Sequence, residues 1–116
     1  MVMLGHLIVP EVCELPATLS KILITDILRE ELGFEGVVIT DSLNMNAVSR
    51  RFGAAFVAVE AVSAGVDVLL MPVSMDDTIN ALIAAVESGD IPESRIDESV
   101  SRIISLKISM GIIEVA

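Results

Sequence analysis

The stretch GVVITDSLNMN, residues 36–46, decides the fold. Residues 37–40 are apolar or β-branched, which predicts a short strand buried on both faces. The chain turns polar at Asp41, directly after this strand. A carboxylate at the C-terminal end of a parallel strand lies where α/β enzymes place their reactive groups. Asp41 is therefore the candidate catalytic residue, and the alternative is that it caps the helix that follows.

Apolar runs alternate with helical patterns on both sides of this strand. Residues 2–9 and 66–71 are further apolar runs, closed by Pro10 and Pro72, and each predicts a buried strand. Helical spacing predicts helices over residues 20–33, a helical region broken near Gly53, a helix over residues 74–89 and a last one over residues 97–110. Alternating strands and helices predict an α/β fold with about three parallel strands. Three strands fit a small free-standing domain and equally three units of a (β/α)₈ barrel.

Composition excludes several classes of function. The chain carries 17 acidic and 7 basic residues, a net charge of −10, and no long basic cluster, so neither nucleic acid nor an anionic membrane is an expected partner. No apolar run reaches the roughly 18 residues that span a bilayer. A single histidine, the lone Cys13 and scattered carboxylates indicate no metal site and no internal disulfide. The N-terminus lacks a signal-peptide pattern, and the cellular compartment stays open.

Five stretches of the chain resemble glycoside hydrolase family 3. Residues 31–45, ELGFEGVVITDSLNM, closely resemble the strand of that family whose LGF-x-G-V-V-x-[ST]-D-x-L-x-M run carries the nucleophile. The other four stretches are VMLGHLIVP at 2–10, LPATLS at 15–20, AGVDVLLMP at 64–72 and IPESRIDESV at 91–100, which are similar to the preceding strand, a helix lead-in, the last strand and the terminal-helix lead-in. They occur in the family's order and cover essentially the whole chain.

The resemblance implies a partial (β/α)₈ TIM barrel, with residues 1–116 as a C-terminal fragment of the catalytic barrel. It implies a retaining exo-β-glycosidase with Asp41 as nucleophile and a carbohydrate substrate, without metal or organic cofactor. Leu43 and Met45 resemble the branch that removes terminal β-linked N-acetylglucosamine, including that of peptidoglycan fragments. The β-glucosidase branch tends to place a Trp after its aspartate, and this chain has no Trp.

The remaining candidates are weighed against structural roles. His6 is expected either to contact the sugar or to be a hydrogen-bonded core residue, and Met45 either to contact the sugar or to form the turn. Asp67 lies near the N-terminal end of its strand, where residues usually stabilise the fold rather than take part in catalysis. We therefore expect it to accept hydrogen bonds from backbone N–H groups or from Arg.

The family's acid/base loop of the form K-H-F-P-G-H-G-D is missing, so we expect the isolated chain to be a poor catalyst or inactive. The alternatives are another exo-β-glycosidase of the family, such as a β-glucosidase, and a non-catalytic partial barrel that forms homo-oligomers through exposed sheet edges.

Overall fold

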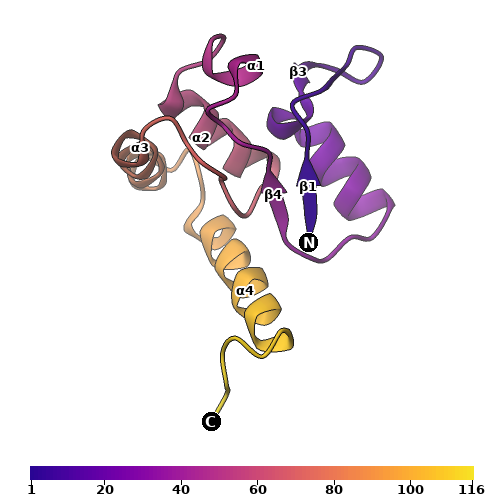
Figure 1. Ribbon diagram of the computed structural model, residues 1–116, viewed down its shortest axis with the longest axis vertical. Helices are drawn as coiled ribbons and strands as arrows, with labels where there is room; N and C mark the ends of the chain where they lie inside the picture. Colours follow the sequence, from indigo (N-terminus) through magenta and orange to yellow (C-terminus); the bar gives the residue numbers. More distant parts are fainter.

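The structure is a computed structural model that describes all of residues 1–116 (Figure 1). Its elements in chain order are β1 (Val2–Leu4), β2 (Ile8–Val9), β3 (Cys13–Pro16), the short 3₁₀ helix η1 (Ala17–Leu19), the π-type helix η2 (Ile22–Glu31), β4 (Val38–Thr40), and the helices α1 (Asn46–Ser49), α2 (Ala54–Ala64), α3 (Met75–Ser88) and α4 (Glu93–Ser109). α4 extends away from the other elements and leads to the C-terminus (Figure 1). None of the helices combines the length and apolar character needed to cross a bilayer.

The central sheet is parallel, as predicted. β1 and β4 pair in parallel, with Leu4 opposite Thr40. A third segment runs beside β4 and forms one parallel bridge, between Ile39 and Val68. Beyond it, the Leu43 N–H donates to the Leu70 carbonyl at 2.9 Å. The α/β class is therefore confirmed, but the predicted third strand over residues 66–71 is reduced to a single bridge with flanking hydrogen bonds.

The prediction of one strand over residues 2–9 is wrong. The chain leaves the sheet after Leu4, and β2 pairs antiparallel with β3, for which the sequence predicted no strand. An apolar run indicates burial or pairing, but it does not specify where the chain changes its pairing partner. Gly5 and His6, which interrupt the run, mark that change.

The helix ends follow their local signals. Gly33 and Gly89, predicted to end helices, adopt left-handed conformations with φ of 69° and 85°. The Ser74 hydroxyl accepts from the Asp77 N–H at 3.2 Å, as a capping residue does. α4 begins at Glu93, four residues before its predicted start, directly after Pro92, which is its extended N-cap residue with φ of −65° and ψ of 139°.

The helices pack behind the sheet and leave its other face bare. In Figure 1, η2 and α2 lie behind β1 and β4 as viewed. The main core lies between the helices and the strands, and its buried members are Leu19, Ile24, Val38, Leu43, Val48, Val57, Ala61, Ala64 and Val66. Gly65 lets η2 approach the end of α2, because a Cβ there would come within 2.9 Å of the Ile24 side chain.

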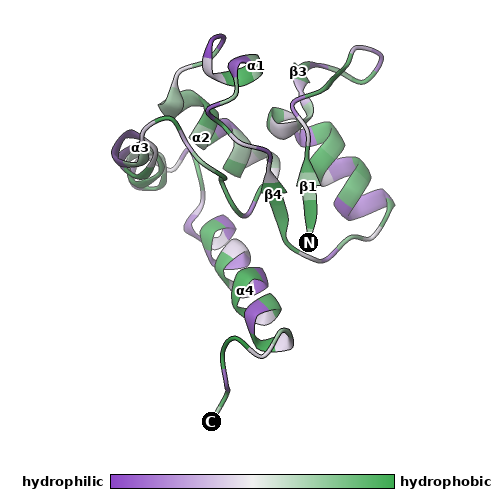
Figure 2. Cartoon of the chain, in the orientation of Figure 1, coloured by the Kyte–Doolittle hydropathy of each residue, from purple (hydrophilic) through white to green (hydrophobic).

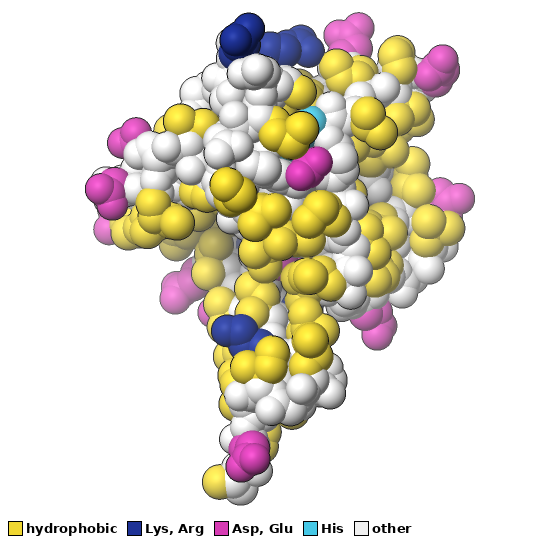
Figure 3. Space-filling model, viewed as in Figure 1, with side chains coloured by type: hydrophobic (Ala, Val, Ile, Leu, Met, Phe, Trp, Pro, Cys, Tyr) yellow, Lys and Arg dark blue, Asp and Glu magenta, His cyan; other side chains and the backbone are white.

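Apolar side chains cover much of the bare face. Figure 2 shows that β1 and most of β4 are hydrophobic, and Figure 3 shows hydrophobic side chains gathered in the middle of this view. Met3 in β1 is 55% exposed there. Sheets of this parallel kind are normally covered on both faces. The uncovered face is therefore a surface suited to burial against further polypeptide.

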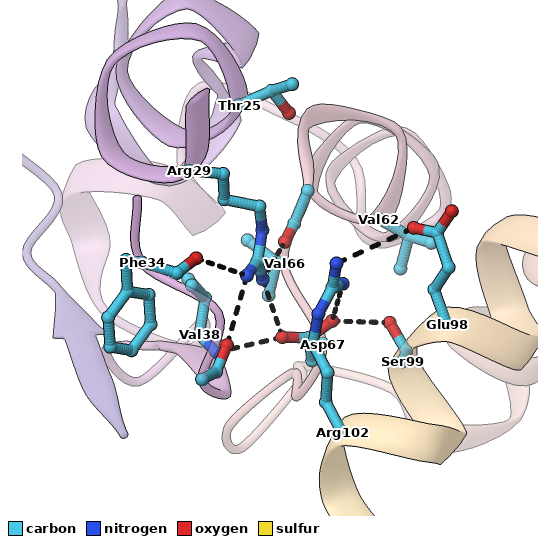
Figure 4. A network of polar contacts seen from close by, with 12 residues as sticks. Thr25, Arg29, Phe34, Val38, Val62, Val66, Asp67, Glu98, Ser99 and Arg102 are labelled. Atoms are coloured by element: carbon cyan, nitrogen blue, oxygen red, sulfur yellow. Dashed lines mark hydrogen bonds and ion pairs between the residues drawn. The ribbon is translucent and has the colours of Figure 1, made fainter. Parts of the chain in front are cut away.

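Asp67 connects the N-terminal end of β4 to two helices (Figure 4). Its side chain has no exposed surface. Oδ2 accepts from Arg29 at 2.7 Å and from the Val38 N–H at 2.9 Å, while Oδ1 accepts from Ser99 at 2.7 Å, Arg102 at 3.1 Å and Arg95 at 3.4 Å. Arg29 comes from η2, and Ser99 and its two arginine neighbours come from α4. The prediction that Asp67 accepts backbone and Arg hydrogen bonds is confirmed.

The charges in this cluster stabilise one another. Burial raises the pKa of Asp67, but the hydrogen bonds from Val38 and Ser99 and the charge of Arg29 outweigh it, so the pKa lies below its ordinary value. Burial lowers the pKa of the Arg29 guanidinium, and the Asp67 carboxylate opposes that effect. The Asp67 carboxylate is therefore ionised at neutral pH and is a structural member of the fold.

We predict that Asp67→Asn lowers the free energy of unfolding by about 3–5 kcal/mol, because it removes the buried anion shared by three partly buried guanidinium groups. Urea unfolding of the chain at pH 7 measures this change. Asp26→Asn is the matched control, since Asp26 lies exposed on η2 and should change stability by less than about 0.5 kcal/mol.

The pH dependence of that difference tests the ionic origin. Because the pKa of Asp67 is depressed, its stabilisation is fully present above the unfolded value of about 3.9 and is lost as pH falls through the folded value. The difference between Asp67 and Asp67→Asn chains should thus persist down to about pH 4 and shrink below it. Equal stability of the two chains at pH 7 would contradict this account of the cluster.

Candidate active site

Asp41 lies at the C-terminal rim of the sheet, on its bare face. Its N–H donates to the Leu4 carbonyl at 2.9 Å, which carries the parallel ladder one step past β4. Successive side chains of a strand point to opposite faces. Val38 is fully buried in the core that the helices form, so Asp41, three residues on, belongs to the other face. Asp67 contacts the helices at the opposite end of the same sheet.

The register places Gly5 and Leu70 on either side of Asp41. Leu4 lies opposite Thr40, which puts Gly5 next to Asp41, and the bridge between Ile39 and Val68 puts Leu70 on the other side. Gly5 has no side chain, and a Cβ there would meet only Leu7 carbons, at 3.6 Å and beyond. The Asp41 carboxylate therefore has room beside it on the β1 side.

The hydrogen bonds of Asp41 favour a reactive role over a capping role. Its Oδ1 accepts from the Ser42 N–H at 2.7 Å, while Oδ2 has no partner within the chain. α1 begins after Met45, and no side chain caps its first turn. Asp41 is thus not the cap of the helix that follows, which was the alternative interpretation. One carboxylate oxygen is held and the other is free to meet a ligand.

His6 joins two segments next to Asp41. Its Nδ1 lies 3.0 Å from the Thr18 hydroxyl, and its Nε2 lies 2.8 Å from the Ser42 carbonyl oxygen. Both ring nitrogens therefore have partners inside the chain, which supports the structural interpretation. The predicted sugar contact stays a prediction. Thr18, a buried residue of η1, was not singled out from the sequence, because its partner is 12 residues away and no local pattern marks the pair.

Met45 lies on the rim beyond Asp41. It is 45% exposed and directly precedes α1, and its N–H donates to the Ser42 carbonyl at 3.2 Å. Leu43 is only 4% exposed and belongs to the core, so the two hydrophobic residues after Asp41 differ in role. Met45 is free to contact a ligand above the sheet, and its role in sugar binding stays a prediction.

The chain alone does not enclose Asp41. None of its five main hollows is lined by Asp41, His6 or Met45. The chain also contains no group of three or more His, Cys, Asp or Glu that could hold a metal ion. The chain therefore forms only one side of a binding site, and the partly free Asp41 carboxylate lies at the edge of that side.

Comparison with known proteins gives the family. Residues 1–106 match the family described as "Glycosyl hydrolase family 3 N terminal domain". The chain is similar to the solved structure of a glycoside hydrolase family 3 β-N-acetylglucosaminidase from Paenibacillus sp. str. FPU-7, with a TM-score of 0.92 and 46% identity over 99% of this chain and 23% of that one.

Two sequence relatives carry different activities in their names. The chain is 30% identical to a "Beta-N-acetylglucosaminidase/beta-glucosidase" of Cellulomonas fimi, over 96% of this chain and 22% of the relative. It is 37% identical to a "Lysosomal beta glucosidase" of Dictyostelium discoideum, over 88% of this chain and 13% of the relative. The chain thus spans less than a quarter of the length of each of these proteins.

Two buried threonines give a matched test of the rim. Thr40 is fully buried, and its hydroxyl accepts from the Leu70 N–H at 3.0 Å. Thr78 is 4% exposed, and its hydroxyl has no partner. We predict that Thr40→Val lowers the free energy of unfolding by about 1–3 kcal/mol, because it leaves the Leu70 N–H unpaired, whereas Thr78→Val is neutral or stabilising. Urea unfolding measures both, and equal effects would show that the Thr40 contact does not hold the rim.

Proposed function

The chain belongs to glycoside hydrolase family 3, and on that premise we propose that it supplies the nucleophile, Asp41, of a retaining exo-β-glycosidase that releases terminal β-linked N-acetylglucosamine. The observation that carries the proposal is the position of Asp41 at the C-terminal rim of a parallel sheet, on the face without helices. In (β/α)₈ barrels that rim holds the catalytic residues. We propose further that residues 1–116 form the C-terminal part of such a barrel.

The free oxygen of Asp41 suits attack on the anomeric carbon. In the first step, Oδ2 forms a bond to that carbon as the glycosidic C–O bond breaks, and the leaving oxygen takes a proton from a general acid. Water then hydrolyses the resulting glycosyl ester and returns the carboxylate. The Ser42 N–H on Oδ1 fixes the carboxylate plane, and the short rigid β4 fixes its position.

The general acid belongs outside this chain in the proposal. A retaining mechanism needs a second group about 5–5.5 Å from the nucleophile. His6 is the only histidine, and both of its ring nitrogens are engaged by Thr18 and Ser42. The open face beside Asp41 also needs further walls to surround a sugar. Isolated residues 1–116 should therefore show little or no glycosidase activity.

The choice of sugar rests on the relatives. The similar structure from Paenibacillus is named a β-N-acetylglucosaminidase, and the residues after Asp41 lack a Trp. The names of the two sequence relatives keep β-glucosidase activity as the second candidate. The two candidates differ in whether the 2-acetamido group of the sugar is required.

The non-catalytic alternative also has an observation in its favour. β1 pairs only with β4, so its other edge is open, and large apolar side chains such as Met1, Met3 and Met71 are more than half exposed. Open edges and apolar faces promote association. A homo-oligomer formed through these surfaces therefore remains the alternative partner proposal.

A segment exchange tests the enzymatic proposal. Residues 1–116 replace the matching segment of the Paenibacillus enzyme, so that the remaining barrel surrounds Asp41. We predict hydrolysis of a nitrophenyl β-N-acetylglucosaminide in preference to the matched β-glucoside. Asp41→Asn should lower kcat/KM by roughly 10⁴-fold or more, as loss of a nucleophile does.

The controls separate a nucleophile from a structural residue. Asp97→Asn, an exposed carboxylate on α4, should leave kcat/KM within about twofold. Azide added to Asp41→Gly should restore turnover and yield the α-glycosyl azide, because the anion attacks from the face that the carboxylate vacates. An active exchanged enzyme that keeps its rate after Asp41→Asn would refute the role of Asp41.

A further inference from the structure

The ring of His6 lies between two parts of the chain that are far apart in sequence. Thr18 is 12 residues away and contacts Nδ1 at 3.0 Å, and Ser42 is 36 residues away and contacts Nε2 at 2.8 Å. The contacts tie the segment after β1 both to η1 and to the turn after β4. The turn is the one that carries Asp41.

The partners of the ring determine its tautomer. A carbonyl oxygen only accepts hydrogen bonds, so the contact with Ser42 requires a proton on Nε2. In the neutral ring Nδ1 then carries a lone pair, which accepts the hydrogen of the Thr18 hydroxyl. Thr18 is fully buried, and a buried hydroxyl needs such a partner. Thr18 therefore selects the tautomer that can donate to Ser42.

Ser42 links this ring to the candidate nucleophile. Its carbonyl accepts from His6 Nε2 and from the Met45 N–H, and its own N–H donates to Asp41 Oδ1 at 2.7 Å. The carbonyl and the N–H of Ser42 belong to two rigid peptide planes that meet at its Cα, so once the carbonyl is held, only the φ and ψ of Ser42 separate it from the N–H. The direction of the bond to Asp41 Oδ1 therefore depends on the contact that His6 makes.

We propose that His6 is a positioning residue, which acts through Ser42 to orient the Asp41 carboxylate, with Thr18 holding the ring in its Nε2–H form. The inference rests on the proposed function, because the orientation of the Asp41 carboxylate matters for catalysis only if Asp41 is the nucleophile. It assigns His6 neither to the sugar nor to proton transfer, since each nitrogen already has a partner. It also adds Thr18 to the residues that support the site.

Two substitutions separate the two nitrogens of the ring. In His6→Gln the side-chain amide nitrogen takes the place of Nε2 and can still donate to the Ser42 carbonyl. In His6→Asn the shorter side chain reaches only the place of Nδ1 and loses that contact. Hydrogen exchange of the Ser42 amide, measured by NMR on the full chain, reports the bond to Asp41 Oδ1. The Val38 amide, which donates to Asp67 at the other end of β4, is the internal reference.

We expect His6→Asn to speed exchange of the Ser42 amide about tenfold relative to Val38, and His6→Gln to keep it near the wild-type rate. Unchanged Ser42 exchange in His6→Asn would overturn the proposal. Equal acceleration of exchange at Ser42 and Val38 would indicate general destabilisation and would also overturn the proposal. A Ser42 exchange rate in His6→Gln as fast as that in His6→Asn would overturn it as well.

A measurement on the unaltered chain remains decisive if a variant fails to fold. The ¹⁵N shifts of the His6 ring should show a protonated Nε2 and an unprotonated Nδ1, with a coupling through the hydrogen bond to the Ser42 carbonyl carbon. The opposite tautomer would overturn the proposal. These readouts involve no turnover, so they succeed or fail independently of whether Asp41 is a nucleophile.

Discussion

The buried carboxylate of Asp67 is the interaction on which the rest of the structure depends. It binds the Val38 N–H at the start of β4, Arg29 of η2 and the side chains of α4, so three elements meet at one charged group. A buried charge is costly unless it is paired and hydrogen-bonded, and this one is both. Because the contact holds the first residue of β4, it fixes the position of this short strand. Asp41 follows that end, on the face that no helix covers.

Asp41 and Asp67 show how position separates two residues of the same type. Asp67 lies at the N-terminal end of the strands, in contact with the helices, where both of its carboxylate oxygens accept hydrogen bonds. Asp41 lies at the opposite rim, where Ser42 holds one oxygen and the other has no partner. Saturation suits a group that stabilises a fold, whereas a free oxygen suits a group that must bind or react. Membership of glycoside hydrolase family 3 supports the proposal that the free oxygen is the nucleophile.

Much of this could be predicted from local signals. The glycines at 33 and 89 and the cap at Ser74 act over a few residues, and they lie where expected. The structural role of Asp67 followed from the end of the strand that it occupies. The proposed role of Asp41 needed the family resemblance in addition to its position. The break at Gly5 and the pairing of β2 with β3 depended on partners that an apolar run does not specify. Likewise, nothing near His6 in the sequence indicates Thr18 or the Ser42 carbonyl, because those contacts form only when the chain folds.

The most direct test of the central claim is to trap the glycosyl ester on the exchanged enzyme and locate it by peptide mass spectrometry. A 5-fluoro derivative of β-N-acetylglucosaminyl fluoride suits this purpose, because fluoride leaves without help from an acid and the ring fluorine slows hydrolysis of the ester. The account predicts one added sugar, on Asp41, and none after Asp41→Asn. A sugar found on a different carboxylate would contradict it.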